Sequence, residues 1–323
     1  MTTPHENQPR NTVTAQAPAM VSIASKVGPS RSSQRPTVMN LKLAVSRYDF
    51  VTVGPIAGRE VLVSFEDQLG SVIDYEDVPH EDLVYIFRAV DTLRKYLDRS
   101  EDLAGVDITI EKHIPFDTYL GGRAATAAAV MVALAGLWDA SIAREDMARL
   151  ARHVGYGVAD AIIGGAVISS LRAAEETTTS VLSQGQIALV LVPAAADLSD
   201  AEVFQTVQAI SSADVDPVAD QTLLEFDQKL IDAVSRGDGK QLALMMHNDF
   251  QPALVQIIPE HNDWLTAGMD EGALAAQTID RGPSLLFVAD TQDAAYQLAE
   301  RYEQRMDITA IAEYGPVAGA RLL

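Results

Sequence analysis

Apolar and polar positions alternate along the first part of the chain. β-Branched and other apolar residues recur between polar ones at residues 12–16, 40–45, 49–54 and 60–66, a two-residue period that is typical of strands. Over residues 81–96 the apolar side chains instead recur every three to four positions, which predicts an amphipathic helix. The front of the chain is therefore expected to be mostly sheet, followed by one helix.

The next stretch of sequence combines strands, a loop and helices. Residues 106–112 read as a strand, and Pro115 opens a loop that contains two adjacent glycines. Residues 124–138 are Ala-rich and apolar but too few to span a bilayer, so they predict a buried core helix. A second helix is expected at 144–153 and, after a short helical stretch, a strand at 162–171.

A polar run at residues 173–180 favours a hairpin tip or a domain edge over a core element. Beyond it, strands and helices alternate, which suggests an α+β domain with a mixed sheet and helices on one face. We therefore expect two domains, at 12–170 and 171–323, behind a disordered tail of residues 1–11. The second domain is expected to contain strands at 187–192, 283–289 and 308–313 and helices at 198–210, 223–246 (broken at 236–239) and 291–304.

Composition narrows the classes of protein. A chain of 323 residues is longer than a domain with a single hydrophobic core usually is, which fits two domains. Its formal net charge of −21 repels phosphate backbones and anionic lipids, so we expect no nucleic-acid partner and no membrane partner. It has no cysteine, which excludes disulfides, Cys-ligated zinc and thiol nucleophiles and fits a reducing compartment. The first ten residues lack the apolar core of a signal peptide, and we expect a cytoplasmic location.

Five local stretches, taken in order, resemble the GHMP small-molecule kinases. Within that superfamily the similarity is greatest to the 4-diphosphocytidyl-2-C-methyl-D-erythritol kinases, ATP-dependent enzymes of isoprenoid precursor synthesis. The resemblance runs from about residue 12 to the C-terminus. It implies a two-domain α/β (α+β) GHMP kinase fold, with an N-terminal domain like domain 2 of ribosomal protein S5 and a ferredoxin-like C-terminal domain. The stretches are Ala17–Ile23 with Val27 and Gly28, Ile110–Pro115 with Leu120–Gly122 and Ala127–Val130, Gly155–Ala166, Gly272–Ala275 with Gly282 and Pro283, and Gly315–Arg321.

The phosphate-binding loop of that family is altered in this chain. The family's loop has the form Pro-x-x-x-Gly-Leu-Gly-Gly-Gly-Ser-x-x-Ala-Ala and precedes a helix whose N-terminal amides hold the ATP phosphates, with the serine near Mg²⁺. Here Gly121 and Gly122 remain, but Arg123 replaces a glycine and Ala124 replaces the serine. A side chain now stands where the backbone must approach phosphate closely, and one oxygen ligand is missing. ATP and Mg²⁺ are implied as cofactors only if the chain is active.

The two residues that the family uses for phosphoryl transfer are also replaced. A lysine in its Ala-Pro-Ala-Lys stretch places an ammonium beside the acceptor oxygen. An aspartate in its Gly-x-Asp-Val-Pro-Phe stretch orients the acceptor alcohol and takes or shares its proton. The matching positions are Met20 and Gly157. Neither carries a charge, so the resemblance implies that no catalytic residue is intact.

One alternative is compensation within the same cleft. If the chain is helical after Gly157, Asp160 lies about one turn further along, and Arg123 could supply the missing positive charge. Asp117 and Asp280 lie in altered loops and are candidate metal ligands, although isolated loop carboxylates in a chain with 45 acidic residues are usually solvated. We therefore assign no metal site.

The substrate-binding motifs differ as well. The family's cytidine-recognising Gly-Tyr-His corresponds to residues 34–36, where Arg35 and Pro36 offer no stacking platform. The family's third motif, Ser-Gly-Ser-Gly-Pro-Thr, keeps only Gly282 and Pro283, with Asp280 at its second position. We interpret these residues as an altered substrate cleft.

The densest basic region of this acidic chain comprises Arg31, Arg35 and Arg47, close to that cleft. These arginines could bind a small anionic metabolite, a nucleotide or an acidic partner, or they could offset nearby carboxylates as ordinary surface charge. The six histidines show no metal-site spacing and are interpreted as surface or core residues.

Three interpretations of function remain open. The leading one is a pseudokinase that has lost phosphoryl transfer and keeps the cleft as a binding or regulatory surface. The second is an active ATP-dependent GHMP kinase with a changed substrate and changed catalytic residues. The third is an interaction protein that assembles with a protein partner and binds no small ligand.

Overall fold

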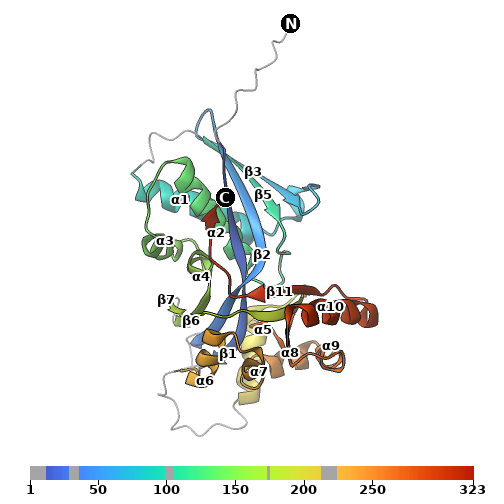
Figure 1. The fold of residues 1–323 in the computed structure, drawn as a ribbon. Helices are drawn as coiled ribbons and strands as arrows, with labels where there is room; N and C mark the ends of the chain where they lie inside the picture. Colours follow the sequence, from blue (N-terminus) through green and yellow to red (C-terminus); the bar gives the residue numbers. More distant parts are fainter. Residues whose placement is uncertain (1–11, 29–35, 99–104, 173–174, 212–223) are drawn as a thin grey trace.

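The computed structural model describes residues 12–28, 36–98, 105–172, 175–211 and 224–323. The predicted tail of residues 1–11, together with Arg31 and Arg35, lies outside these ranges. The strands form two sheets, with helices packed on each (Figure 1). This is the mixed α/β architecture with two sheets that the sequence predicts.

The first sheet is built around two long strands. In the described part of the chain it has eight strands, six of which follow the order β12-β1-β2-β5-β3-β4. β5 and β6 pair with different halves of β2, and β7 pairs with β6. The strands are β1 (Val13–Val27), β2 (Val38–Ile56), β3 (Val61–Asp67), β4 (Val72–Ile73), β5 (Gly105–Lys112), β6 (Ala166–Arg172), β7 (Glu175–Val181) and β12 (Arg321–Leu322).

β2 is one strand of 19 residues, so the prediction of two separate strands at 40–45 and 49–54 is wrong. The pairing of β1 with β2 shifts after Pro18, and Ser46 and Arg47 have no partner on β1. Pro18 has no N–H to donate to β2, and a bulge in β2 opposite it accommodates the missing hydrogen bond. Ser46 and Arg47, which in the sequence suggest a break between two strands, therefore form a bulge within a single strand.

Four helices accompany the first sheet. The Ala-rich α2 contacts β1 and β2, and α1 packs against α2. Most of α2 is buried, which confirms the predicted core helix. The helices are α1 (His80–Tyr96), α2 (Gly122–Leu137), α3 (Arg144–Ala151) and α4 (Val158–Ile163), and a 3₁₀ turn η1 (Tyr75–Asp77) precedes α1.

The predicted strand at 162–171 begins four residues later than expected. Ile162 and Ile163 are the last residues of α4, and β6 starts at Ala166. Between them Gly164 and Gly165 adopt positive φ values of 66° and 67°. These positive φ values, which glycine adopts without a steric penalty, end the helix and turn the chain into the strand.

The second sheet is antiparallel, in the order β11-β8-β10-β9 within the described residues. The pattern predicts β8, β10 and β11 and the helices α5, α6, α7 and α10, but no element between residues 247 and 282. β9 and α8 are too short to show a period. The elements are β8 (Ile187–Val192), β9 (Ala275–Thr278), β10 (Leu285–Ala289), β11 (Ile311–Gly315), α5 (Asp200–Ser211), α6 (Gln228–Arg236), α7 (Gly239–Ala243), α8 (Gln251–Ile257), α9 (Glu260–Asp270) and α10 (Gln292–Met306).

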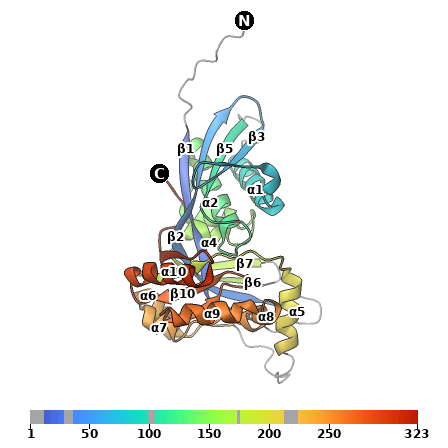
Figure 2. The ribbon, with the colours of Figure 1, turned by 90° about the vertical axis from the view of Figure 1, so that its right-hand side faces the viewer.

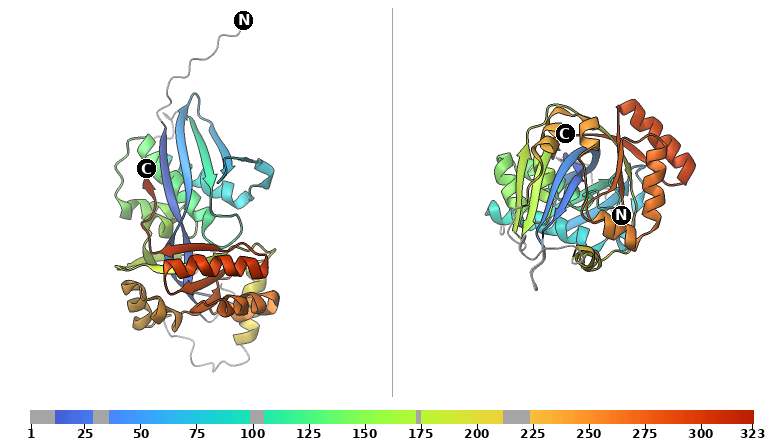
Figure 3. Two further views of the ribbon diagram at one scale, coloured as in Figure 1. Left: turned by 45° about the vertical axis from the view of Figure 1, so that its right-hand side comes forward. Right: turned by 90° about the horizontal axis from the view of Figure 1, so that it is seen from below.

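Segments from both halves of the chain meet in the middle of the molecule (Figures 2 and 3). β7 pairs with β6, so a hairpin joins the first sheet where the polar run at 173–180 lies. The C-terminal strand β12 returns to pair with β1, and Ser46 on β2 is hydrogen-bonded to Glu313 on β11. The division of the chain at residue 170 stays a prediction.

Among the described helices, none combines the length and apolar composition needed to cross a membrane.

Candidate functional site

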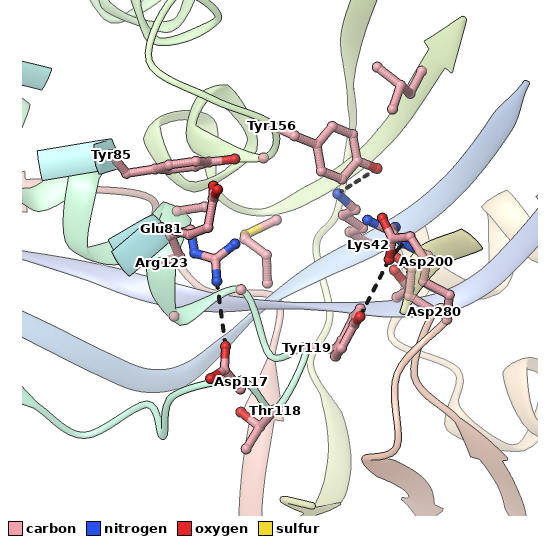
Figure 4. A pocket seen from close by; sticks show the side chains of 18 of the residues that line it. Lys42, Glu81, Tyr85, Asp117, Thr118, Tyr119, Arg123, Tyr156, Asp200 and Asp280 are labelled. Carbon is pink, nitrogen blue, oxygen red and sulfur yellow. Dashed lines mark hydrogen bonds and ion pairs between the residues drawn. The ribbon is translucent and has the colours of Figure 1, made fainter. Parts of the chain in front are cut away.

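A cavity of about 700 Å³ lies where the two halves of the chain meet. Its lining comes from β1, β2, the start of α1, the loop before α2, the turn before α4, α5 and the turn after β9. Figure 4 shows that its charged side chains form two groups. We call them the α2 end (Glu81, Asp82, Asp117 and Arg123) and the junction end (Lys42, Tyr156, Asp200, Asp280 and Arg281).

The altered loop forms one wall of the cavity. Gly121 has a φ of 80° and lies against β1, where an added Cβ would come within 3.2 Å of the backbone of Met20. α2 begins at the next residue, and Gly122, Arg123 and Ala124 all border the cavity. The structure therefore brings the whole predicted loop together at the N-terminal end of a buried helix.

Carboxylates engage the side chain of Arg123. Its Nε donates to Asp82 Oδ2 at 3.0 Å, and its Nη2 lies 3.5 Å from Asp117 Oδ1. The guanidinium also lies over the ring of Tyr85, 5.7 Å from the centroid. Glu81 borders the same part of the cavity. The α2 end thus contains one cation and three carboxylates, and two of those carboxylates hold the cation.

Burial raises the pKa of Asp82, and the charges of Lys112 and Arg123 act in the opposite direction. Lys112 itself is buried behind the loop, where it is bound to Asp49 and lies 3.0 Å from Thr126 Oγ1. The Lys112–Asp49 pair has no net charge, although the charge of Lys112 lowers the pKa of Asp82 more than the charge of Arg123 does.

Met20 and Gly157 both border the cavity, as the resemblance implies. Met20 is 5% exposed, and its N–H donates to Leu120 O at 3.0 Å. Gly157 precedes α4 with a φ of 82°, and its N–H donates to Glu176 Oε1 at 2.9 Å. At these two positions the cavity is therefore lined by a thioether side chain and by a glycine backbone.

Asp160 lies in α4, as expected, and is fully buried. Its Oδ2 lies 2.8 Å from Lys42 Nζ, and its Oδ1 accepts a hydrogen bond from Thr178 Oγ1 at 2.7 Å. Burial by itself lowers the pKa of Lys42, but the charges of Asp160 and Asp280 raise it above its ordinary value. The cation beside Asp160 is therefore Lys42, whereas the hypothesis of compensation paired it with Arg123.

Lys42 is the residue that the sequence analysis missed. It pairs with Ser22 across the strands, while Met20 pairs with Ala44. Residues two apart in a strand share a face, so Lys42 points to the same side of the sheet as Met20. The available signal was the alternation in residues 40–45, which places Asn40 and Lys42 on one face of a strand that otherwise reads as core.

At the junction end, polar side chains of both halves are linked. Asn40 Nδ2 donates to Asp280 Oδ2 at 3.2 Å, and Arg281 Nη1 lies 3.4 Å from the same oxygen. Arg281 Nε donates to Asp200 Oδ1 at 2.7 Å, and Tyr119 OH lies 3.4 Å from that oxygen. Asp280 is 7% exposed and has a φ of 50°, which is unusual for a residue other than glycine.

The remaining predicted cleft residues have different positions. Pro36 borders the cavity, whereas Gly282 packs against the ring of Tyr119 and does not border it. The carbonyl of Pro283 lies 2.8 Å from His261 Nε2. Gly282 and Pro283 therefore support the cavity wall from behind.

Glu176 is a second residue that the sequence analysis missed, and unlike Lys42 it has no signal in the sequence. It lies on β7, 8% exposed, behind Gly157. Burial and the charge of Asp160 raise the pKa of Glu176 to about 7, against the opposing effect of Lys42. A buried carboxyl that titrates near neutral pH thus lies next to the Lys42–Asp160 pair.

Arginines engage both candidate metal ligands, Asp117 through Arg123 and Asp280 through Arg281. Among the described residues, no three His, Cys, Asp or Glu side chains are grouped as a metal site would need.

The two-sheet fold that carries this cavity is also found in solved structures of small-molecule kinases. A homoserine kinase from Cytophaga hutchinsonii superposes with a TM-score of 0.71 at 16% identity, covering 99% of this chain and 100% of the other. A 4-(cytidine 5′-diphospho)-2C-methyl-D-erythritol kinase also superposes at 0.71, with 20% identity and coverage of 93% and 98%. Residues 84–170 match the family model of the GHMP kinases N terminal domain.

Full-length sequence relatives give the same class. The 4-diphosphocytidyl-2-C-methyl-D-erythritol kinase of Pseudarthrobacter chlorophenolicus is 31% identical over 323 residues, covering 100% of this chain and 98% of that protein. The one of Streptomyces coelicolor is 32% identical and covers 89% and 91%. The chain belongs to the GHMP kinase family. Within it, the chain is a homologue of the 4-diphosphocytidyl-2-C-methyl-D-erythritol kinases.

Proposed function

We propose that this chain is a GHMP kinase homologue that has lost phosphoryl transfer and keeps its interdomain cavity as a binding site for a small molecule. The observation that carries this proposal is the charge at the α2 end. Three carboxylates and a single arginine surround the start of α2, and Asp82 and Asp117 already engage that arginine. A nucleotide phosphate at this helix start would therefore meet excess negative charge.

ATP fits poorly with these residues on electrostatic grounds. Two like charges about 4 Å apart repel by about 4 kcal/mol at the effective dielectric of a protein surface, which outweighs the attraction of a helix N-terminus, at most about 2 kcal/mol. Mg²⁺ would offset the repulsion, but Ala124 offers no oxygen to it, and Arg123 already engages two of the three carboxylates, Asp82 and Asp117. The residues present therefore do not fit a magnesium nucleotide.

The test is thermal unfolding of the full chain with Mg·ATP, Mg·ADP and 4-diphosphocytidyl-2-C-methyl-D-erythritol, followed by an assay for phosphorylated product. A ligand bound only by the native state raises the unfolding midpoint by mass action. We expect no rise with either magnesium nucleotide at millimolar concentration and no product. A nucleotide-dependent rise together with product would overturn the proposal.

A second candidate function, an active kinase with relocated residues, is favoured by one contact. Lys42 and Asp160 place an ammonium and a carboxylate 2.8 Å apart beside Met20 and Gly157, the positions where the family has its lysine and aspartate. This candidate predicts Mg²⁺-dependent ATP turnover that Lys42→Met and Asp160→Asn each abolish. Turnover that survives both substitutions would exclude the roles assigned to the pair.

The same experiment separates Arg123 from that pair. In the compensation hypothesis from the sequence, Arg123 supplies the positive charge. In that case Arg123→Ala abolishes turnover, whereas Lys42→Met leaves some activity. The contacts of Arg123 with Asp82 and Asp117 favour the opposite result.

A further inference from the structure

Three buried oxygens lack hydrogen-bond partners where β1 and β2 meet the turn after β9. They are Ser25 Oγ, Asn40 Oδ1 and Asp280 Oδ1, and none of them has a partner among the described residues. Their residues are 1%, 0% and 7% exposed. We call these three atoms the oxygen cluster. A buried oxygen without a partner destabilises a fold, and in a native protein it often marks a bound water or ion.

The three residues are neighbours in space. Asn40 lies directly opposite Ser25 on β1, and side chains in such positions share a face, with Cβ atoms about 4.5–5.5 Å apart. Asn40 Nδ2 donates to Asp280 Oδ2 at 3.2 Å. A bridge joins Ser25 to Asn248, whose amide donates to the main-chain carbonyl of Asp280 at 2.6 Å. One small occupant can therefore contact all three oxygens.

The oxygen cluster lies behind the cavity wall. Ser25 and Asn40 do not border the cavity. Asp280 does border it, but its Oδ1 is buried. The cluster is therefore separate from the small-molecule site of the proposed function.

Two of the three oxygens can only accept. An amide oxygen and a carboxylate oxygen donate no proton, so an occupant must offer them either a proton or a positive charge. The orientation of the Asn40 amide is fixed, because Asp280 Oδ2 accepts and the amide nitrogen must face it. Hydroxyl, amide and carboxylate oxygens are the ligands that hard cations prefer. The chemistry of the cluster thus suits a hard cation.

The surrounding charge selects a monovalent cation. Asp160 pairs with Lys42, and Asp200 and Asp280 both pair with Arg281 (Figure 4). Three carboxylates therefore accompany two cations, and one further positive charge balances them. A divalent ion would exceed that balance, and in the described part of the chain no three His, Cys, Asp or Glu side chains are grouped to hold one.

We propose that the oxygen cluster binds one alkali cation, Na⁺ or K⁺, with water completing its coordination. The cation fastens the turn that carries Asp280, in the second half of the chain, to β1 and β2 of the first sheet. Asp280 has a φ of 50°, a conformation that needs support from its surroundings. The inference goes beyond the proposed function, since it concerns the junction of the two halves and is independent of phosphoryl transfer.

The first test is thermal unfolding of the full chain in KCl, NaCl and choline chloride at the same ionic strength. Equal ionic strength keeps the screening of the net charge constant, and choline is too large for a buried site of three oxygens. A cation bound only by the folded state raises the midpoint by mass action. We expect KCl or NaCl to raise it by about 2 °C above choline chloride if the site is about nine-tenths filled. Equal midpoints in the three salts would overturn the inference.

A serine variant assigns the effect to the cluster. Ser25→Ala removes one ligand, and a roughly tenfold loss of affinity cuts the difference between the salts to less than half. In choline chloride the variant should be at least as stable as the unchanged chain, because the deleted hydroxyl has no partner among the described residues.

The matched control is Ser169→Ala. Ser169 is also a buried serine without a described partner and also lies opposite Asn40, but on β6, two strands away from Ser25. The control should keep the full difference between the salts. A difference that survives Ser25→Ala, or that Ser169→Ala removes as well, would overturn the assignment.

Crystallography locates the occupant. In crystals grown with RbCl, the anomalous scattering of rubidium distinguishes an alkali cation from water. If NaCl gives the higher midpoint, oxygen contacts shorter than the hydrogen bonds of a water, about 2.7 Å, take the place of that signal. We expect the cation in contact with Ser25, Asn40 and Asp280, and density with neither property would identify a water and overturn the inference. Product in the ATP assay would overturn the loss of phosphoryl transfer and leave the cation site standing.

Discussion

At the scale of single residues, the most consequential contact is the ion pair between Lys42 and Asp160. Both side chains are buried, at 5% and 0% exposure. A buried ion pair offers limited net stability because both ions lose their hydration, yet removal of one partner leaves a costly unpaired charge. This asymmetry makes the pair testable by itself, apart from any ligand.

Lys42→Met is expected to lower the free energy of unfolding by about 3–5 kcal/mol, because it leaves Asp160 charged and buried without its cation. Asp160→Asn added to it should recover much of that loss. Urea denaturation of the single and double variants measures both values. A double variant that is no more stable than Lys42→Met alone would contradict this account of the pair.

Glu176 makes stability depend on pH. Its pKa rises from the ordinary 4.5 to about 7 in the folded chain, through burial and the charge of Asp160. Between these values the folded state holds a proton that the unfolded state has released. The contribution of Glu176 is therefore fully present below pH 4.5 and is lost as the pH rises through about 7.

We expect Glu176→Gln to remove this dependence, since glutamine does not titrate. Denaturation midpoints of the two proteins between pH 4.5 and pH 8, taken as a difference, isolate the contribution of Glu176 from that of the other carboxyls. The variant should gain relative stability as the pH rises through about 7. A difference that is constant with pH would show that Glu176 is ionised in the folded chain.

At the scale of elements, the turn between α4 and β6 sets the position of the C-terminal segment against α4. Gly164 and Gly165 both have positive φ, and the backbone of Gly165 is hydrogen-bonded to Val317 and Ala44, but only at Gly164 would an added side chain meet another segment. A Cβ on Gly164 would lie 2.0 Å from Gly319 N, whereas a Cβ on Gly165 would meet nothing within 4 Å. The bridge between Gly164 and Ala318 thus holds the C-terminal segment against α4.

This pair of glycines provides a substitution with its own control. Gly165→Ala should cost roughly 1–2 kcal/mol, the penalty of a left-handed conformation alone. Gly164→Ala should cost more for two reasons: Gly164 has a ψ of −161°, which at positive φ only glycine readily adopts, and the added methyl also displaces the segment at Gly319. Urea denaturation of both variants gives the comparison. Equal losses would mean that the C-terminal segment moves away freely.

The sequence predicts best those helices and strands whose conformation follows from the pattern of their own residues. The Ala-rich run that forms α2 is apolar enough to require burial, and the spacing of apolar residues in α1 requires one covered face. β9, with four residues, carries no comparable signal and owes its strand conformation to pairing with β10. The single long strand β2 depends in the same way on β1 and its Pro18.

At the scale of the whole molecule, net charge is the dominant global property. A formal charge of −21 produces repulsion across the folded chain, and added salt screens it over a Debye length of about 8 Å at physiological ionic strength. We expect the thermal midpoint at pH 7 to rise when NaCl is added. The rise should shrink near the isoelectric point of about 4.5. A midpoint that falls with salt at pH 7 would show that attractive ion pairs outweigh the net repulsion.

The candidate site was only partly visible in the sequence. The altered loop around Arg123 is contiguous, so its residues reach the cavity together wherever the loop lies. Arg35 lies outside the described residues. Gly282 lies behind Tyr119 and the carbonyl of Pro283 contacts His261, so neither borders the cavity directly. Lys42 lies 118 residues from Asp160, and Asn40 lies 240 residues from Asp280. No local sequence pattern predicts contacts between residues that are so far apart in the chain.

By itself, the sequence determined the class of fold, the buried core helix and the altered residues of the loop, because periodicity, composition and contiguous motifs are properties of neighbouring residues. Only the tertiary structure decided which charges meet. The pairing of β1 with β2 sets the face on which Lys42 lies, α4 brings Asp160 to it, and the turn after β9 delivers Asp280. Electrostatic energy depends on distance in space, and that distance exists only once the chain has folded.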